Sequence, residues 1–473
     1  MKNHLSLFAL MLFLSNVLSA QSANWIKPYT PRIDSLFADL QQGNQPGLAV
    51  GIVKGGQLVL SKGYGLANLE HRLPFTPNTI SDIGSLAKQI TCFAVVLLAQ
   101  RNQLSLDDNI RKYLPDVPDF GQPITIRHLI HHVSGIREIY GMLELVGWRQ
   151  GDAIRQNEAL DLVMRSRELN FAPGAAHSYY NTGYMLLAEI IQKASGQQFE
   201  PWMKANIFAP LGMKDTYIMD VQGELFPNVA DSYAKGEQQE WIKQYDNSTV
   251  IGAGGIYTTL PDLARWASNY RDGKLGGMAA LQQMYQRGIL NSGDTLEYAF
   301  GLEVDQYRGL RCIQHTGSSA GYRAAWLYFP DQDLTILVKS NFANFNSLAT
   351  CRKIADIVLA KTLKAQPMRI AFTNKIKNPA PPIYTTALGD FVGRYYCPDM
   401  ETTYTIAAEQ DGLIAQHRLN GILKLKQIEV DLFEEPSILG KIQFERNATG
   451  AVTGMRVTSG SVLNLWMGKV AGE

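Results

Sequence analysis

Apolar side chains gather in blocks along the chain, and the longest block predicts a buried helix. From Ile90 to Ala99 the run is apolar apart from Thr91 and Cys92. A helix with apolar side chains on nearly every face belongs in the centre of a domain rather than at its surface. We therefore predict a central helix that begins near Ser85.

Shorter patterns on either side of this helix predict a domain of the α/β class. Two aliphatic runs that flank Gly55 and Gly56 predict a hairpin over residues 48–60. Helices are predicted over 125–135, 152–165, 183–194, 262–270 and 348–363, and strands over 298–304, 311–315, 323–329 and 334–339. Strands near both ends, with helices between them, indicate one sheet that joins the two ends of this region.

The last quarter of the chain predicts a second, smaller domain. Residues 374–382 are polar and rich in proline, which is typical of a linker. Short strands then follow without any helical pattern, at 391–396, 403–407, 412–417, 422–427, 441–446, 454–458 and 463–467. Regularly spaced short strands predict a small antiparallel barrel or sandwich.

Residues 1–20 have the pattern of a secretory signal peptide. Lys2 gives a positive start, an apolar stretch runs from Leu5 to Leu18, and Ala20 ends a typical cleavage site. The apolar stretch is shorter than the roughly 20 residues that a membrane-spanning helix needs. We expect an exported protein, periplasmic or extracellular, with no stable membrane insertion after the signal is removed.

Charge and cysteine content narrow the classes of function. The chain has 44 basic and 43 acidic side chains, so no net field attracts nucleic acid. Export permits a disulfide among Cys312, Cys351 and Cys397, and the sequence leaves their pairing open. Cys92 lies in the apolar helix and is expected to be a core residue.

Three histidines in the predicted helix over residues 125–135 have a spacing that suits a metal. His128, His131 and His132 would share one helical face. No glutamate stands between them as in zinc helices of the His-Glu-x-x-His type, and no fourth ligand is evident. We therefore expect no metal site.

The start of the central helix carries the first chemical motif. Ser85 and Lys88 lie on one helical face, where free backbone N–H groups favour negative charge. Burial disfavours the ammonium form of a lysine, which lets it act as a base toward the serine hydroxyl. Ser232 and Lys235 repeat the spacing, but no apolar helix follows them. Taken alone, the first pair fits a polar helix start as well as it fits a nucleophile and its base.

Tyr179 and Asn181 form the second motif, in a loop before a predicted helix. A tyrosine beside a lysine has its ionised form stabilised and can transfer a proton, and an asparagine can donate to and accept from a substrate amide. Packing of the aromatic rings on the next helix would also explain this loop. Tyr245 and Asn247 repeat the spacing, and we interpret them as a coincidence.

The third motif is His315-Thr316-Gly317, predicted to end the strand over residues 311–315. Small residues here would let a substrate lie along the strand backbone. The backbone N–H of Ser318, with that of Ser85, would form an oxyanion hole. His315 and Thr316 would contact a substrate carboxylate or carbonyl. Taken alone, the motif is better explained as an ordinary strand end and turn.

In this order, the three motifs resemble those of the serine penicillin-recognising hydrolases. The tyrosine variant is similar to the branch that holds class C β-lactamases, DD-peptidases and D-aminopeptidases or esterases. The tail from Leu388 resembles the lipocalin-like domain of some members. The resemblance implies a sandwich of an antiparallel sheet with helices on both sides and an all-α subdomain, followed by a small antiparallel β-barrel. Together with the signal and linker patterns, it divides the chain into four segments: signal peptide 1–20, hydrolase domain 21–370, linker 371–387 and β domain 388–473.

The resemblance also implies a mechanism through an acyl-enzyme. Ser85 would attack an acyl carbonyl while its proton passes to Lys88 and Tyr179, and the N–H groups of Ser85 and Ser318 would hold the oxyanion. The resemblance implies no cofactor and no metal. A small-molecule or peptide acyl substrate would be bound by Asn181, His315, Thr316 and Gly317.

One departure bears on the substrate. β-Lactamases of this branch carry lysine where this chain has His315, and a neutral imidazole binds an anion less strongly. We therefore expect an exported peptidase or esterase for peptide, D-amino-acid or ester bonds. The alternatives are a class C-like β-lactamase and a penicillin-recognising binding protein without turnover. The C-terminal domain would be a stabilising cap or would limit the substrate with its loops.

Overall fold

The computed structural model describes residues 24–365, 388–410 and 412–470, and these form two compact units. The first unit holds the described residues up to Leu106, Leu187–Ile289 and the described residues from Thr295 to 365. The second holds Asp107–Leu186, Leu290–Asp294 and the described residues from 388 onward. The predicted signal peptide and linker lie outside the described residues, and the boundaries of the four segments stay predictions.

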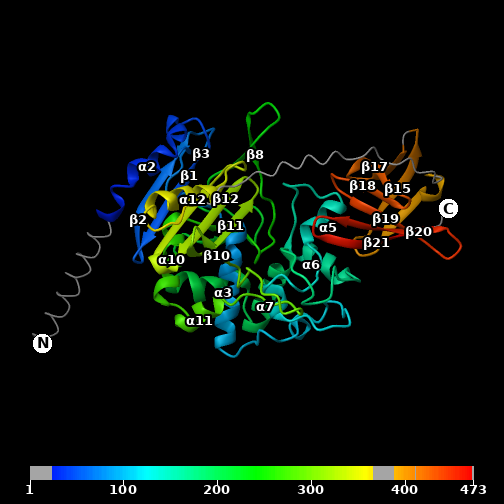
Figure 1. Ribbon diagram of the computed structural model, residues 1–473, viewed down its shortest axis with the longest axis horizontal. Helices are drawn as coiled ribbons and strands as arrows, with labels where there is room; N and C mark the ends of the chain where they lie inside the picture. Colours follow the sequence, from blue (N-terminus) through cyan, green and yellow to red (C-terminus); the bar gives the residue numbers. More distant parts are fainter. Residues whose placement is uncertain (1–23, 366–387, 411, 471–473) are drawn as a thin grey trace, which may run out of the picture. The chain divides into compact units, whose positions relative to one another are not determined.

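A six-stranded antiparallel sheet forms the framework of the first unit (Figure 1). The order β10-β11-β12-β13-β1-β2 places the early hairpin beside the last strand, which confirms that one sheet joins both ends of this region. The strands are β1 (Leu48–Lys54), β2 (Gln57–Tyr64), β10 (Glu303–Tyr307), β11 (Leu310–Ser319), β12 (Tyr322–Phe329) and β13 (Leu334–Ser340).

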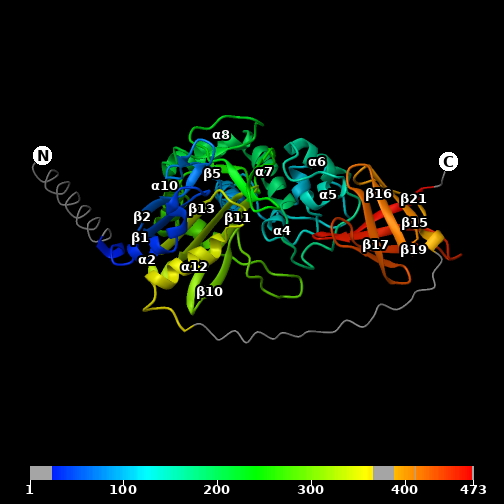
Figure 2. The ribbon, with the colours of Figure 1, turned by 90° about the horizontal axis from the view of Figure 1, so that it is seen from above.

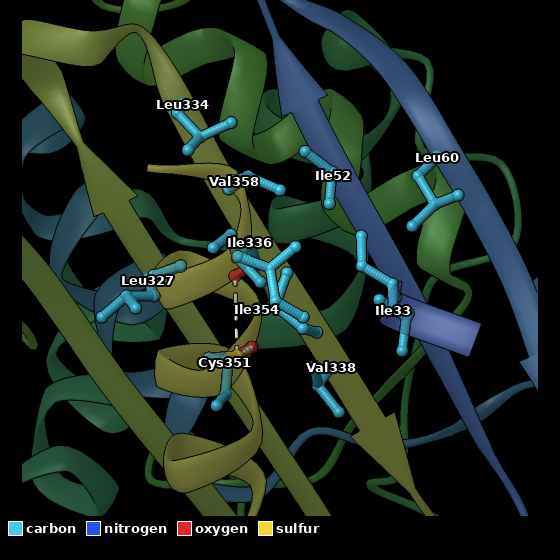
Figure 3. Close-up of a cluster of buried hydrophobic side chains, with 14 of the residues drawn as sticks. Ile33, Ile52, Leu60, Leu327, Leu334, Ile336, Val338, Cys351, Ile354 and Val358 are labelled. Atoms are coloured by element: carbon cyan, nitrogen blue, oxygen red, sulfur yellow. Dashed lines mark hydrogen bonds between the residues drawn. The ribbon is translucent and has the colours of Figure 1, made fainter. Parts of the chain in front are cut away.

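Helices cover both faces of this sheet (Figure 2), as predicted. On one face Ile52 and Ile336 meet Ile33 of α2 (Thr30–Ser35) and Ile354 of α12 (Ser347–Val358) in one buried apolar cluster (Figure 3). On the other face Gly51 lies against α10 (Leu260–Asp272). Successive residues of a strand point to opposite faces, so the aliphatic run of β1 is buried from both sides.

The helix α3 (Ala87–Gln100) is the buried central helix that the sequence predicts. Every residue from Ala87 to Leu98 is buried, and α11 (Gly277–Met284) packs against it. A 3-10 turn, η2 (Gly84–Leu86), leads directly into α3. This turn places Ser85 at the entrance of the helix and Lys88 in its first turn.

Smaller elements complete the first unit. A three-stranded sheet has the order β5-β9-β6, and β3 with β4 and β7 with β8 form two hairpin-like pairs. The elements are η1 (Ala38–Gln42), β3 (Leu66–Asn68), β4 (Leu73–Pro74), β5 (Ser81–Asp82), α8 (Phe199–Met203), η4 (Lys204–Phe208), α9 (Ala209–Leu211), β6 (Tyr217–Ile218), β7 (Ser232–Lys235), β8 (Trp241–Gln244), β9 (Ile256–Thr258) and η5 (Pro330–Gln332).

The second unit combines a helical region with a closed barrel. Its helices are η3 (Ile110–Lys112), α4 (Ile126–Ile130), α5 (Ile139–Leu145), α6 (Gln156–Arg165) and the first residues of α7 (Thr182–Ser195). The barrel follows η6 (Leu388–Phe391), and each strand pairs with its neighbour in sequence while β14 pairs with β21. The eight described strands are β14 (Gly393–Cys397), β15 (Thr402–Glu409), β16 (Gly412–His417), β17 (Gly421–Glu429), β18 (Leu432–Glu435), β19 (Gly440–Arg446), β20 (Val452–Ser459) and β21 (Val462–Val470).

Several sequence-based predictions need correction. The chain over residues 125–135 is not one helix, because α4 ends at Ile130 and His132 adopts a left-handed conformation with φ 59°. The three histidines therefore do not share a helical face. The strand predicted over 298–304 begins only at Glu303, and the sequence pattern missed β18.

The four cysteines are all buried free thiols. Burial raises the pKa of Cys312 to about 12 and that of Cys397 to about 11.

Within the described residues, no helix combines the length and apolar character that crossing a bilayer would require.

Candidate functional site

Ser85 and Lys88 are in direct contact at the start of α3. Lys88 Nζ lies 2.9 Å from Ser85 Oγ and donates to the carbonyl oxygen of Ala253 at 3.1 Å. The lysine side chain is fully buried, whereas Ser85 is half-buried. A buried amine within hydrogen-bonding distance of a hydroxyl is placed to take its proton, which turns the serine into a nucleophile.

The backbone of β11 packs closely against the turn that carries Ser85. A Cβ atom on Gly317 would overlap the carbonyl oxygen of Ile83, and one on Gly84 would lie 2.5 Å from the backbone nitrogen of Ser318. Gly84 also has φ 51°, a conformation that favours glycine. Both glycines are therefore needed for the close approach that brings the N–H of Ser318 near the nucleophile turn. This arrangement suits an oxyanion hole.

The His-Thr-Gly motif lies inside β11 rather than after a strand end, which corrects the sequence-based prediction. β11 runs from Leu310 to Ser319, and residues 315–319 pair with β12 on one side. Its other neighbour, β10, pairs with it only as far as Gln314. Among the described residues, the last part of β11 thus has a strand partner on one side only. An extended substrate can add to such an edge through backbone hydrogen bonds.

His315 is buried and neutral at pH 7. Burial, together with the charge of Lys88, lowers its pKa to about 4. Its Nδ1 lies 2.6 Å from the carbonyl oxygen of Thr316, which can only accept, so Nδ1 carries the proton. Its Nε2, 3.2 Å from the Tyr298 hydroxyl, is then the acceptor. His315 gives the site a fixed imidazole tautomer in place of a positive charge.

Two carboxylates that the sequence analysis missed support the nucleophile turn. Asp82 at the end of β5 is buried, and its Oδ1 accepts from the N–H of Gly84 at 2.8 Å. Burial and the neighbouring Asp246 raise the pKa of Asp82 to about 7, while the hydrogen bond from the N–H of Gly84 opposes that shift. The Ser319 hydroxyl donates to Asp246. Asp82 thus holds the turn before Ser85, and Asp246 holds the end of β11.

In the second unit, Tyr179 lies against a histidine ring. The His132 and Tyr179 ring centroids are 4.4 Å apart. His132 Nδ1 accepts from the N–H of Tyr180 at 3.3 Å, and its carbonyl oxygen accepts from the N–H of Ser178 at 3.0 Å. His132 is fully buried, whereas Tyr179 is 38% exposed. His132 therefore holds the loop from three points, while the Tyr179 side chain stays partly exposed.

Asn181 is held from the other side by Glu138. Its backbone N–H and its side-chain amide both donate to the Glu138 carboxylate, the latter at 2.8 Å. Because Nδ2 is committed to Glu138, the amide oxygen is oriented away from the carboxylate, as an acceptor. Thr182, the next residue, donates to the carbonyl oxygen of Arg137 at 2.7 Å and accepts from the N–H of Ile139 at 2.8 Å.

The predicted site residues thus fall into two groups. Ser85, Lys88 and the β11 residues His315, Thr316, Gly317 and Ser318 belong to the first unit, and Tyr179 and Asn181 share one short segment of the second. Ser232 and Lys235 lie three residues apart on a strand, β7, and so point to opposite faces. The described residues contain no group of three or more side chains that would hold a metal ion.

Some of the missed residues left a signal in the sequence. Asp82 precedes Gly84 by two residues, and an aspartate that bonds to the second following N–H forms a common turn. Tyr245 and Asn247 looked like a chance repeat, yet Asp246 between them bonds to β11. Contacts such as those of Tyr298 with His315 arise from tertiary packing, which local sequence does not encode.

Comparisons with known proteins agree with this architecture. A family model described as Beta-lactamase matches residues 33–360. Penicillin-binding protein 4* of Bacillus subtilis is 27% identical over 328 residues, which cover 65% of this chain and 71% of that protein. D-aminopeptidases of Gluconobacter oxydans and Brucella canis are 26% and 28% identical, over 66% and 68% of this chain. The alignments span 58% and 62% of those two proteins.

Solved structures show the same fold. The octameric penicillin-binding protein homologue from Pyrococcus abyssi superposes with a TM-score of 0.63 at 23% identity, covering 93% of this chain and 99% of that one. The D-amino acid amidase from Ochrobactrum anthropi SV3 gives a TM-score of 0.59 at 21% identity, covering 70% of this chain and 98% of that one. Because the family match also spans well over half of the sequence, the chain belongs to the β-lactamase family of serine hydrolases.

Proposed function

We propose that the protein hydrolyses amide or ester bonds of small peptides and D-amino-acid derivatives through an acyl-enzyme on Ser85. The observation that carries this proposal is the 2.9 Å contact between Lys88 Nζ and Ser85 Oγ, made by a fully buried lysine. Burial shifts the protonation equilibrium of a lysine toward the neutral amine, and the molecules in that form can accept the serine proton.

In the proposed reaction, Ser85 Oγ attacks the acyl carbonyl and its proton moves to Lys88. The carbonyl carbon becomes tetrahedral, and its oxyanion is stabilised by the N–H groups of Ser85 and Ser318. Tyr179, in the role that the family pattern gives it, passes the proton to the leaving amine or alcohol as the acyl bond breaks. Water then adds to the acyl-enzyme, and loss of Ser85 Oγ as the leaving group regenerates the hydroxyl and frees the acid.

Two observations favour peptide and D-amino-acid substrates over β-lactams. His315 is neutral, since its pKa is about 4, so it gives no fixed positive charge to a β-lactam carboxylate. The relatives at 26% and 28% identity include D-aminopeptidases. Export, with residence in the periplasm or outside the cell, is part of this proposal and rests on the pattern of residues 1–20.

Intact-protein mass spectrometry tests the proposal. The mature protein is incubated with a D-alanine p-nitroanilide, a p-nitrophenyl ester and penicillin G. We expect an acyl adduct on the wild type and on Ser232→Ala, the control at the second Ser-x-x-Lys, and none on Ser85→Ala. Rapid loss of the penicillin adduct would indicate a β-lactamase instead. No adduct from any acyl donor would contradict acyl-enzyme chemistry and favour a binding protein.

A further inference from the structure

The barrel is built into the same compact unit as the segment that carries Tyr179 and Asn181. Asn170 exchanges two hydrogen bonds with β21 and the turn before it: its amide donates to the carbonyl oxygen of Ser461 and accepts from the N–H of Leu463, both at 2.8 Å. The Tyr404 hydroxyl of β15 donates to the carbonyl oxygen of Leu145, at the end of α5, at 2.7 Å. The barrel therefore contacts the helical region through specific polar pairs.

One of these pairs is a buried ion pair. The side chain of Arg137 is 1% exposed, and that of its barrel partner Asp399 is 7% exposed, with Nη1 and Oδ2 3.4 Å apart. Arg137 also donates to the carbonyl oxygen of Glu168 at 2.6 Å. Burial lowers the pKa of the guanidinium, and the charges of Asp399 and Glu168 oppose that shift. Asp399 also accepts from the N–H of Arg167 at 3.1 Å.

Arg137 is next in sequence to the residue that holds Asn181. The Glu138 carboxylate accepts both the backbone N–H and the side-chain amide of Asn181. The carbonyl oxygen of Arg137 itself accepts from the Thr182 hydroxyl at 2.7 Å. A displacement of the Arg137 backbone is therefore expected to reach Asn181 through the charge-assisted bonds of Glu138, and Thr182 through its neutral hydrogen bond to the Arg137 carbonyl.

Loss of Asp399 would disturb this arrangement more than loss of a surface charge. In Asp399→Asn the buried guanidinium of Arg137 keeps the cost of its desolvation but loses the buried one of its two carboxylate partners, since the remaining Glu168 carboxylate, 3.5 Å away, is 46% exposed. The side chain can recover solvation only by moving outward, and its backbone must follow in part. Exposed ion pairs contribute little by comparison, because water already solvates both partners.

We propose that the C-terminal barrel positions the substrate-binding segment around Asn181, through Asp399, Arg137 and Glu138. The barrel is then part of the machinery that sets the geometry of the site, rather than a cap on the domain or a set of loops that selects substrates by size. Asp399 and Arg137 are positioning residues, since they act through Glu138. The inference deepens the proposed function and rests on it for its effect on turnover.

Hydrogen exchange followed by mass spectrometry tests the positioning without any substrate. In Asp399→Asn we expect the amides of residues 178–182 to exchange about tenfold faster than in the wild type. Glu401→Gln removes a neighbouring barrel carboxylate that pairs with exposed Arg165, and serves as the matched control with unchanged exchange. Equal exchange in Asp399→Asn, Glu401→Gln and the wild type would overturn the proposal.

A second variant distinguishes a specific effect of the Arg137–Asp399 pair from general misfolding. Arg137→Lys keeps the charge but loses the planar fork, so it should increase exchange of residues 178–182 by a smaller factor. In the double variant with Asp399→Asn, the two effects should not add, because both act through one pair. Additive effects, or exchange that rises equally across the whole unit, would contradict the pathway through Arg137.

Turnover adds a readout that separates the two proposals. We expect kcat for an amide substrate to fall by about tenfold in Asp399→Asn while Ser85 can still be acylated. If Ser85 is never acylated in the wild type, the proposed function fails while the exchange result still decides the role of the barrel. If acylation occurs and exchange is unchanged, the barrel proposal fails alone.

Discussion

The ring of His132 lies 4.4 Å from the ring of Tyr179, and its Nδ1 accepts the backbone N–H of the next residue, Tyr180. The same histidine was weighed from the sequence as a metal ligand. Its left-handed backbone, with φ 59°, turns the ring away from the end of α4 and under the Tyr179 loop. We interpret His132 as the residue that fixes the position of the tyrosine.

Replacing His132 by asparagine tests this interpretation. Asparagine tolerates the left-handed backbone and offers an amide oxygen as acceptor, so the fold should be retained while the ring is lost. We expect acylation by an amide to slow by roughly tenfold to a hundredfold, because a displaced Tyr179 protonates the leaving amine poorly. Acylation by a p-nitrophenyl ester, whose leaving group needs no proton, should slow much less.

The test is the comparison between the rates of acylation by the amide and by the ester. His128→Asn, a change of another histidine in the same region, is the matched control and should affect both substrates little. Equal slowing of amide and ester acylation in His132→Asn would indicate general loosening of the loop and contradict a specific role at Tyr179.

The raised pKa of Asp82 predicts a pH dependence of stability. The folded protein holds this proton up to about pH 7, whereas an unfolded aspartate releases it near its ordinary pKa of 3.8. Stability should therefore fall as the pH rises from about 4 to 7, by at most about 1.4 kcal/mol per pH unit. In Asp82→Asn this slope is removed, so the variant should gain stability relative to the wild type as the pH rises.

Denaturant unfolding at pH 5, 6, 7 and 8 measures this difference. Asparagine keeps an oxygen for the N–H of Gly84, so the turn before Ser85 should survive. Asp331→Asn, on the exposed turn η5, is the control for loss of a surface carboxylate. A difference between Asp82→Asn and the wild type that is the same at every pH would count against ionisation of Asp82 in this range.

His315 predicts a trend of the opposite sign. Its pKa is lowered to about 4, so between about pH 4 and 6.5 the unfolded state binds a proton that the folded state does not. Stability from this group therefore rises with pH through that window and is lost in acid. His315→Asn should remove this rise. The stability of the variant relative to that of the wild type should therefore increase as the pH falls from 6.5 to 4. A relative stability of His315→Asn that increases with rising pH would refute the lowered pKa.

Much of the fold could be predicted from the sequence, because its signals are local. The apolar run after Ser85, the hairpin around Gly55 and the regular strands of the tail each fix an element by periodicity. The errors lie where tertiary contacts override local pattern. β11 continues through His315-Thr-Gly because β12 pairs with it throughout, and the short β18 is defined by its neighbours in a closed barrel.

The candidate site was predictable to a lesser degree. The Ser85–Lys88 contact follows from helical geometry, since residues three apart share a face. The supporting contacts of Tyr298 with His315 and of Glu138 with Asn181 join residues that are 17 and 43 positions apart in the chain. A single sequence holds no record of those distances, so only the structure shows that they orient the motifs.

The chain divides discontinuously between its two units, and this has a consequence for biosynthesis. Asp107–Leu186 belongs to the unit that the barrel completes, yet the barrel begins only at η6. Roughly 200 residues separate Leu186 from Leu388, which corresponds to roughly 10 to 40 s of translation. During that interval Arg137 and Asn170 lack their barrel partners, because those residues have not yet been synthesised. We therefore expect the segment that carries Tyr179 to reach its final state only after the last strand has left the ribosome.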